Sequence, residues 1–330
     1  MEKNILLTVA IPTFNRKEPL KRALDSVLRQ VEDDVEVLVV DNASDDGTDA
    51  MVATFQKQYP TLQYEKNSEN IGADRNFLKC LRDAKGKYVL LLGSDDVLLN
   101  GAIQHITGFL REHDVSAAFL NHVFFSGEFH GLEGCTAPFS GIAKDIETAD
   151  KNIFMTYAKE QITFMSAIIL KRENVAKVEN PERFIGTNFL HTCLFFASTY
   201  KKTDTFGIIA TPCVADDSSR PILGDNGFYI FGTCMHHVYC EIAPQYGYDT
   251  DEMLSIYNSW LKKAMLRSVA NSKIIGNFHY DIYEKNILKL PNMKQMPVLQ
   301  LECRVYALIP TKILKIAKGI YRKIKYKNEV

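Results

Sequence analysis

VEVLVVDNASDDGT, residues 35–48, decides the fold class, because it joins a strand-like run to a helix-like run through a polar turn. The apolar run 35–40 has the composition of a buried strand. Asp41 follows at its carboxyl end, and the residues 44–47 are typical of a turn that leads into a helix. Apolar residues then recur at helical spacing across 48–59. The stretch therefore predicts one strand–turn–helix unit.

Similar units stand on both sides of this stretch. Strand-like runs occupy 6–11 and 87–92, and amphipathic helical patterns cover 19–28, 73–84 and 101–112. Strands that alternate with helices predict an α/β fold with a doubly wound, mainly parallel sheet flanked by helices. Ligands of such sheets bind beyond the carboxyl ends of the strands.

The pattern becomes less regular after about residue 115. Further strand-like runs are 117–125, 162–170 and 206–214, and 188–201 has the pattern of a helix rich in aromatic residues. Beyond about residue 240 the sequence becomes helical and increasingly basic. We therefore expect three parts, residues 1–115, 116–240 and 241–330.

The composition favours a globular cytoplasmic protein. A net charge of −1 over 330 residues gives no general attraction to nucleic acid, so no nucleic-acid partner is expected. Seven scattered cysteines without a CxxC pair suit a reducing compartment. No apolar run is long enough to span a bilayer, and the first residues lack the pattern of a signal peptide.

Four polar clusters are expected at the ligand-binding edge of the sheet. They are PTFNR (12–16), DNASDDGT (41–48), NIGADRNF (70–77) and GSDD (93–96). Asp41 can accept hydrogen bonds from a nucleobase or ribose, and Arg75 can offer a fork of donors to a phosphate. The adjacent Asp95 and Asp96 make sense if a hard divalent cation neutralises them while it binds a diphosphate.

The four clusters, in this order and spacing, resemble the donor-binding half of a family 2 glycosyltransferase with the GT-A fold. The sequences NIGADRNFL and LLGSDD are similar to those of the abequosyltransferase-like subgroup, which builds bacterial O-antigen and capsule sugars. The resemblance covers roughly residues 1–115. By it, 1–115 and 116–240 are the donor and acceptor halves of one GT-A domain, and 241–330 is a helical extension.

The resemblance implies roles for individual residues. Asp41 would contact the base or ribose, Arg75 would lie near the diphosphate, and Asp95 takes the position of the metal-binding aspartate of the DxD motif. The implied cofactor is Mn²⁺ or Mg²⁺, with Asp95 and Asp96 as its ligands. The implied donor-binding residues are Pro12, Thr13, Asn15, Asp41, Arg75, Ser94 and Asp95.

Gly93 is the point at which the chain departs from the family. The family commonly has LDSDD where this chain has LGSDD, so the first carboxylate of the DxD motif is absent. Water, Ser94 or Asp96 must then meet whatever that carboxylate would contact.

The activity implied is an inverting transfer of a sugar from a nucleotide-sugar donor, with a UDP-sugar favoured. The implied acceptor is a glycan hydroxyl, on a polyprenyl-linked intermediate of O-antigen, capsule or another bacterial surface polysaccharide. The implied location is the cytoplasm or the cytoplasmic face of the inner membrane. Because a DxD carboxylate is missing, a catalytically inactive nucleotide-sugar-binding scaffold is the alternative.

An inverting transfer needs a base that takes the proton from the acceptor hydroxyl. The family often supplies it from an acidic pair at a helix start, but the corresponding stretch ERFIGTNFLHT (182–192) lacks that pair. Three candidates stay open: His191, Glu182 and the adjacent aspartates Asp216 and Asp217. Each has a plainer interpretation, as a core histidine, a surface carboxylate and part of a polar loop.

The C-terminal segment 309–327 predicts a basic amphipathic helix. Its apolar positions are Ile313, Ala317, Ile320 and Ile324, among seven lysines and arginines. Such a helix can lie on an anionic membrane surface, and peripheral membrane contact is the interpretation we favour. A helix packed on its own domain and a homodimer contact are the alternatives.

Overall fold

A computed structural model describes residues 4–136, 139, 141–218 and 225–318. The chain divides into two compact units, residues 1–220 and 221–330. The expected boundary near residue 115 lies within the first unit. The expected boundary near residue 240 lies within the second unit, where Val238–Ile242 is π-helical.

The first unit is built on one sheet of nine strands in the order β3-β2-β1-β4-β8-β6-β9-β5, with β7 paired to β9. The strands are β1 (Leu7–Thr13), β2 (Val35–Asp41), β3 (Gln63–Lys66), β4 (Tyr88–Leu91), β5 (Val97–Leu98), β6 (Ala117–Phe125), β7 (Ile146–Thr148), β8 (Ile168–Lys171) and β9 (Phe206–Asp217). Every residue of β1 and β2 is buried, which agrees with apolar runs covered on both faces.

Parallel and antiparallel strand pairs occupy different portions of the sheet. The N-terminal strands β1 to β4 pair in parallel, and β6 pairs in parallel with β9. The strands β5, β7 and β8 join their neighbours antiparallel. The expected α/β sheet is therefore present, and its mixed portion lies in the half where the sequence pattern is irregular.

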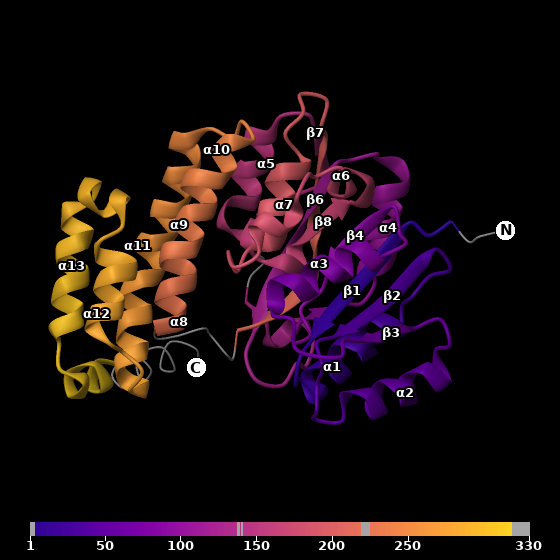
Figure 1. Ribbon diagram of the computed structural model, residues 1–330, viewed down its shortest axis with the longest axis horizontal. Helices are drawn as coiled ribbons and strands as arrows, with labels where there is room; N and C mark the ends of the chain where they lie inside the picture. Colours follow the sequence, from indigo (N-terminus) through magenta and orange to yellow (C-terminus); the bar gives the residue numbers. More distant parts are fainter. Residues whose placement is uncertain (1–3, 137–138, 140, 219–224, 319–330) are drawn as a thin grey trace. The chain divides into compact units, whose positions relative to one another are not determined.

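Helices cover both faces of this sheet (Figure 1). The helices are α1 (Lys17–Leu28), α2 (Thr48–Gln58), α3 (Ala73–Asp83), α4 (Ala102–Glu112), α5 (Lys151–Ala158), α6 (Arg172–Ala176) and α7 (Leu190–Ser198). Side chains of α1 and α4 share one core with Leu7, Val9 and Ile11 of β1. The helix α3 contacts β1, β2 and β4 and also α6 and α7, so it belongs to the other layer.

The strand predicted for 162–170 is mostly wrong. Residues 159–163 and 165–167 form short 3₁₀ turns, η2 (Lys159–Thr163) and η3 (Met165–Ala167), and the part that forms a strand is β8. The reason is tertiary, because Ser166 is held at the end of β4 by two hydrogen bonds described below. The apolar composition of the stretch reflects burial of Ile162 and Ala167 and does not mark a strand.

The second unit is helical. It contains α8 (Asp225–Phe228), α9 (Met235–His237), α10 (Ala243–Gln245), α11 (Thr250–Ile275), α12 (Tyr280–Tyr283) and α13 (Pro297–Leu308), and residues 311–318 are also helical. The Asp249 side chain caps α11 by accepting from the Glu252 N–H, and Gly276 ends it at φ +85°. The expected helical C-terminal extension is thus present. Across the described part of the chain, no helix has the length and apolar character needed to cross a bilayer.

Candidate functional site

Strand register brings the four polar clusters to one edge of the sheet. Thr13 is paired with Asp41 at the ends of β1 and β2. Asp217 is paired with Phe125 at the ends of β9 and β6, and Val97, just after GSDD, is paired with Ala215. The carboxyl ends of parallel strands therefore carry the predicted residues, as in other α/β sheets.

Asp41 organises the loop that follows β2. Its Oδ1 accepts from the backbone N–H and the hydroxyl of Ser44 at 2.9 and 2.6 Å, and its Oδ2 accepts from the Tyr64 hydroxyl at 2.6 Å. Burial, followed by this bond to Asp41, raises the pKa of Tyr64 far above its usual value. Asp41 is 0% exposed, and its contact with a base or ribose stays a prediction.

Asn15 joins the PTFNR and DNASDDGT loops. Its backbone N–H donates to the Ser44 hydroxyl at 2.8 Å, and its side-chain oxygen accepts from the Asp45 N–H at 2.9 Å. It adopts a left-handed φ of 50°, which asparagine tolerates better than most residues. Pro12 and Thr13 are buried beside it, and the Thr13 hydroxyl has no partner among the described residues.

An amide network, formed by Asn42, Asn67, Asn70 and Asn76, connects the second and third clusters. Asn67 donates to the side-chain oxygens of Asn42 and Asn76 at 3.1 and 2.9 Å, and Asn42 donates to Asn70 at 2.8 Å. Asn76 donates to the buried carbonyl of Val40 at 3.0 Å. The network is uncharged, and it fixes the end of β2 against the start of α3.

The start of α3 presents two charged residues in different environments. Arg75 is exposed and forms no ion pair among the described residues, and its contact with a phosphate stays a prediction. Asp74 is buried, and its Oδ2 accepts from the N–H groups of Gly186 and Asn188 at 2.7 and 3.2 Å. Asp74 therefore holds the loop that leads into α7, and burial raises its pKa.

Asp96 is turned into the protein, and its role as a metal ligand stays a prediction. Its Oδ2 accepts from the Ser166 hydroxyl at 2.5 Å and its Oδ1 from the Asp217 N–H at 3.3 Å. Ser166 in turn accepts from the Gly93 N–H at 2.8 Å. Burial, with the nearby carboxylates of Asp216 and Asp95, raises the pKa of Asp96 well above its usual value.

This orientation of Asp96 explains the glycine at position 93. A Cβ at Gly93 would lie 2.5 Å from Asp96 Oδ2, a distance that real Cβ atoms essentially never show. The missing DxD carboxylate and the inward-facing Asp96 are therefore two parts of one local structure. Ser94, the neighbouring predicted residue, is 5% exposed.

Asp95 keeps an accessible carboxylate. Its side chain is 30% exposed and pairs with the Arg16 guanidinium. Arg22 of α1 donates to the Asp95 carbonyl at 2.6 Å and to Asp217 Oδ2 at 2.7 Å, and its guanidinium lies 5.0 Å from the centre of the Phe125 ring. Arg22 therefore fixes the GSDD loop to the end of β9.

These residues form a carboxylate cluster, which we define as Asp95, Asp96, Asp216 and Asp217. Burial, together with the charges of Asp95 and Asp217, raises the pKa of Asp216 to about 7. Negative charge is thus crowded at this edge even though Arg16 and Arg22 are present. A cation would relieve the repulsion.

The donor set fits a divalent cation bound together with a diphosphate. Among the described residues, no three His, Cys, Asp or Glu side chains converge on a common metal position. Mg²⁺, however, commonly uses one or two carboxylates and completes its shell with substrate phosphates and water. Asp95 and Asp216 are the carboxylates that would hold such a cation, and a third protein ligand would not be required.

The three candidate bases lie in different places. Asp217 belongs to the carboxylate cluster. Glu182 is exposed and pairs with Arg82 in the last turn of α3, seven residues beyond Arg75, and this bond lowers its pKa. The structure therefore does not bring Glu182 to the cluster, and an ionised surface carboxylate with a lowered pKa is a weak base.

His191 is buried among aromatic side chains. Its Nε2 lies 2.9 Å from the Thr163 carbonyl, so Nε2 carries the proton that is donated there, and Nδ1 has no partner among the described residues. The rings of Phe77 and Phe189 have centroids 6.1 and 6.3 Å from the imidazole. Burial lowers the pKa of His191 to about 4, so it stays neutral near pH 7. The contacts favour its core interpretation.

Several site residues were missed by sequence reasoning. Arg16 ends the PTFNR cluster, and a cation beside an expected diphosphate was a usable signal. Arg22 stands on an ordinary amphipathic helix, and Ser166 stands in a run of apolar residues, so neither carries a local signal. Their roles depend on contacts between residues that are 70 or more positions apart.

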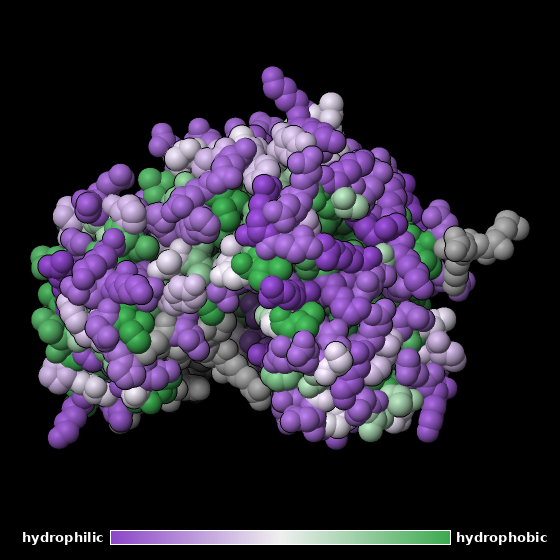
Figure 2. Space-filling view, in the orientation of Figure 1, coloured by the Kyte–Doolittle hydropathy of each residue, from purple (hydrophilic) through white to green (hydrophobic). Residues whose placement is uncertain are grey.

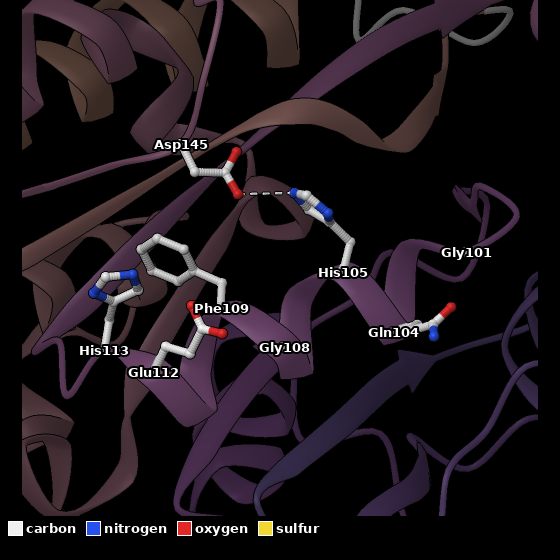
Figure 3. Close-up of a pocket in the computed structure, with 8 residues that line it drawn as sticks. All are labelled: Gly101, Gln104, His105, Gly108, Phe109, Glu112, His113 and Asp145. Carbon is white, nitrogen blue, oxygen red and sulfur yellow. Dashed lines mark ion pairs between the residues drawn. The ribbon is translucent and has the colours of Figure 1, made fainter.

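A separate hollow of about 440 Å³ lies along α4 (Figure 3). It is lined by Gly101, Gln104, His105, Gly108, Phe109, Glu112, His113 and Asp145. The His105 Nε2 and Asp145 Oδ2 atoms are 2.9 Å apart across it. None of the residues predicted for the donor site lines this hollow, so it is not the expected donor site.

Comparison with known families identifies the class. Residues 8–172, half of the chain, match the family described as Glycosyl transferase family 2. The chain therefore belongs to family 2 of the glycosyltransferases, which are enzymes that transfer sugars. The family expected from the four clusters is confirmed.

Two relatives and one solved structure are informative. The abequosyltransferase RfbV of Salmonella typhimurium is 27% identical over 67% of this chain and 68% of its own length. A Campylobacter jejuni GalNAc(5)-diNAcBac-PP-undecaprenol beta-1,3-glucosyltransferase is 31% identical over 54% of this chain, and the match spans only 56% of its length. S. aureus TarS in complex with UDP-GlcNAc aligns with a TM-score of 0.62 at 13% identity, over 97% of this chain and 92% of the other. This likeness confirms the GT-A fold.

Proposed function

We propose that the protein is an inverting glycosyltransferase that moves a sugar from a nucleotide-sugar donor to a glycan hydroxyl. The observation that carries the proposal is the carboxylate cluster at the sheet edge where family 2 enzymes, by resemblance, bind their donor. A UDP-sugar is the favoured donor, since the structural neighbour TarS was solved with UDP-GlcNAc. Arg75, which is exposed and unpaired among the described residues, would bind the diphosphate.

The metal proposed is Mn²⁺ or Mg²⁺, with Asp95 and Asp216 as its protein ligands. Such a cation, when bound, stabilises the negative charge that develops on the leaving diphosphate. Arg22 would keep the Asp95 backbone in place through its bonds to the Asp95 carbonyl and Asp217. The Asp96–Ser166 bond would fix the turn from behind.

The base is proposed to be Asp217, since its neighbour Asp216 is proposed as a metal ligand. Support comes from Arg22, which binds both Asp217 and the Asp95 carbonyl, whereas Glu182 pairs with Arg82 away from the carboxylate cluster and His191 is buried. The acceptor hydroxyl would approach from the side of β9, and its proton would pass to a carboxylate oxygen as the hydroxyl oxygen attacks the anomeric carbon.

The acceptor is proposed to be a polyprenyl-linked glycan in bacterial surface polysaccharide synthesis, handled at the cytoplasmic face of the inner membrane. The support is similarity to an abequosyltransferase and to a glucosyltransferase whose name specifies an undecaprenol-linked acceptor. O-antigen and capsule are the two polysaccharides that the resemblance names.

The alternative is a nucleotide-sugar-binding scaffold without catalysis. Gly93 and the inward-facing Asp96 favour it, because together they leave one accessible carboxylate in the GSDD motif. The scaffold and the enzyme predict the same donor binding and differ only in turnover.

The test is an assay of UDP-, GDP-, dTDP- and CDP-sugars with Mn²⁺ or Mg²⁺, read as release of nucleoside diphosphate and as transfer to polyprenyl-linked acceptors. Calorimetry measures donor binding in parallel. The proposal is supported if turnover depends on the metal and is abolished by Asp216→Asn, by Asp217→Asn or by both. Binding of a donor without turnover on any acceptor supports the scaffold, and absence of binding contradicts both.

A further inference from the structure

The helix α13 of the second unit has apolar residues on two opposite faces. One face, Leu299, Cys303 and Ala307, is buried. The other face, which we call the apolar stripe, is exposed and consists of Val298, Leu301, Val305 and Leu308, at 70, 63, 50 and 75%. Its spacing of three and four residues places all four side chains in one line along the helix. A line of large exposed apolar residues needs an explanation that isolated ones do not.

The next helical segment also exposes large apolar side chains. In residues 311–318, Leu314 is buried, whereas Ile313 and Ile316 are 55 and 63% exposed. Figure 2 shows hydrophobic side chains at the molecular surface in the region where Figure 1 places α13. Ile320 and Ile324, also expected on the apolar face of this segment, lie outside the described residues.

Positive charge accompanies this surface. Lys312 and Lys315 are exposed next to Ile313 and Ile316. Residues 303–327 contain eight lysines and arginines and no acidic residue, although Glu302 flanks the stripe on α13. Apolar side chains combined with cations are the composition of helices that lie in an anionic membrane interface.

We infer that the apolar stripe, Ile313 and Ile316 dock on an anionic lipid bilayer, with Lys312 and Lys315 contacting the headgroups. The inference extends the membrane-face location in the proposed function and moves the main contact from 309–327 back onto α13. It is tested without any substrate, so its failure and a failure of the proposed reaction are separate results.

A lipid surface fits this face better than a second copy of the chain. A specific protein interface uses roughly 20–30 residues on each side and is depleted of lysine. The exposed apolar surface offers six residues on two short segments, and lysines accompany it. A bilayer needs no shape complementarity, so a narrow apolar line with flanking cations is sufficient.

The apolar arm of the test uses Leu301→Gln combined with Leu308→Gln in the full chain. Flotation with vesicles of phosphatidylcholine and phosphatidylglycerol measures the partition coefficient, which should fall at least ~10-fold. Ile153→Gln is the matched control, because Ile153 is an exposed apolar residue of α5 at 44%. The control should bind vesicles as the unaltered protein does. Circular dichroism verifies that each variant is folded.

The charge arm uses Lys312→Glu combined with Lys315→Glu, with Lys57→Glu and Lys202→Glu as the matched exposed pair. The first pair should lower partitioning at least ~10-fold and the second less than ~2-fold. Vesicles of phosphatidylcholine alone, or high salt, should weaken binding of the unaltered protein.

Two results would overturn the inference. One is vesicle binding that is absent, or that does not change in the Leu301/Leu308 variant. The other is a dimer in light scattering that the same variant converts to monomer while vesicle binding is absent, which would assign the stripe to a second copy.

Discussion

Two parts of the same sheet edge use different kinds of polar side chain, mainly neutral in one part and charged in the other. At the ends of β1 and β2, the amide network and the Asp41–Ser44–Tyr64 contacts join the loops through neutral donors and a single buried carboxylate. At the ends of β4 and β9, the carboxylate cluster meets Arg16 and Arg22. The first part joins its loops through paired amides and hydroxyls, and the second gathers four carboxylates around two guanidinium groups.

This difference suggests a structural function for the amide network and a catalytic or ligand-binding function for the carboxylate cluster. A neutral network costs little to bury when its members are paired, and it makes a rigid frame. Crowded carboxylates destabilise the fold unless a ligand neutralises them, so proteins keep them where they are used. We therefore expect changes in the carboxylate cluster to affect activity first and changes in the amide network to affect stability first.

The largest effect is expected at Asp95. Asp95→Asn removes the accessible carboxylate of the GSDD motif while it keeps the shape of the side chain. We expect kcat/KM to fall at least ~10³-fold, because a cation at the leaving group is worth several kcal/mol. The melting temperature should change little, because a partly exposed ion pair contributes only ~0–1 kcal/mol.

Asp45→Asn is the control for this comparison. Asp45 is an exposed aspartate of the loop after β2, and it contributes its backbone N–H to Asn15. The same chemical change there should alter kcat/KM less than ~2-fold. Equal losses in the two variants would remove the distinction between the two parts of the edge.

Sequence reasoning predicted the fold and the sheet edge at which the polar clusters meet. The strand-like run 117–125 coincides with β6, and the helices expected at 19–28, 48–59, 73–84 and 101–112 are present within two residues at each end. Each of these elements is long, periodic and bounded by local signals. The polar clusters could be placed because parallel strands fix which ends meet.

The orientation of individual side chains could not be predicted. Asp95 and Asp96 are adjacent and chemically identical, yet one faces solvent and the other faces Ser166. That choice depends on η3, 70 residues away, and on the space beside Gly93. The same limitation applies to Asp41, whose burial depends on Tyr64 of β3.

The second prediction concerns Gly93, which lies beside the carboxylate cluster and leaves no space for a Cβ atom. Gly93→Ala brings a Cβ to 2.5 Å from Asp96 Oδ2, so Asp96 must move and its bond to Ser166 is strained. We expect the free energy of unfolding to fall by ~1–3 kcal/mol, as for other overpacked sites. Denaturant unfolding measures it.

The control for Gly93 is Gly108→Ala. A Cβ at Gly108 meets no atom within 4 Å, and the residue lies inside α4. Alanine there should stabilise by about 0.5–1 kcal/mol, because it is the better helix former. In addition, Asp96→Ala combined with Gly93→Ala should cost less than the sum of the two changes. Strict additivity would show that Asp96 is not what excludes the Cβ.

The third prediction tests the amide network. Asn76→Ala removes the buried bond to the Val40 carbonyl and one of the two bonds that the Asn67 amide donates. We expect a loss of about 1–2 kcal/mol in unfolding free energy and a kcat within ~3-fold of the unaltered protein. Asn152→Ala, an exposed asparagine in the first turn of α5, should change stability by less than about 0.5 kcal/mol. A large fall in kcat without a fall in stability would assign the network to catalysis.

The smallest effect on activity is expected at His191. Its ring contacts Phe77 of α3, the helix whose start the amide network joins to β2. Burial lowers the pKa of His191 from 6.5 to about 4, so the unfolded chain binds more protons than the folded chain between these values. The histidine therefore lowers stability as the pH falls through that window. His191→Gln should remove this part of the acid sensitivity and can keep the bond to the Thr163 carbonyl.

His122→Gln is the matched control, because burial also lowers the pKa of His122 to about 4 and no role in the reaction is expected for it. Both variants should flatten the stability profile between pH ~4 and ~6.5, and both should keep kcat within ~3-fold. A general base would instead cost ~10²- to 10⁴-fold in kcat, and only in the His191 variant. That outcome would move the base from the carboxylate cluster to α7. The buried, neutral imidazole of His191 would then be the group that accepts the proton, although its Nδ1 has no charged partner among the described residues.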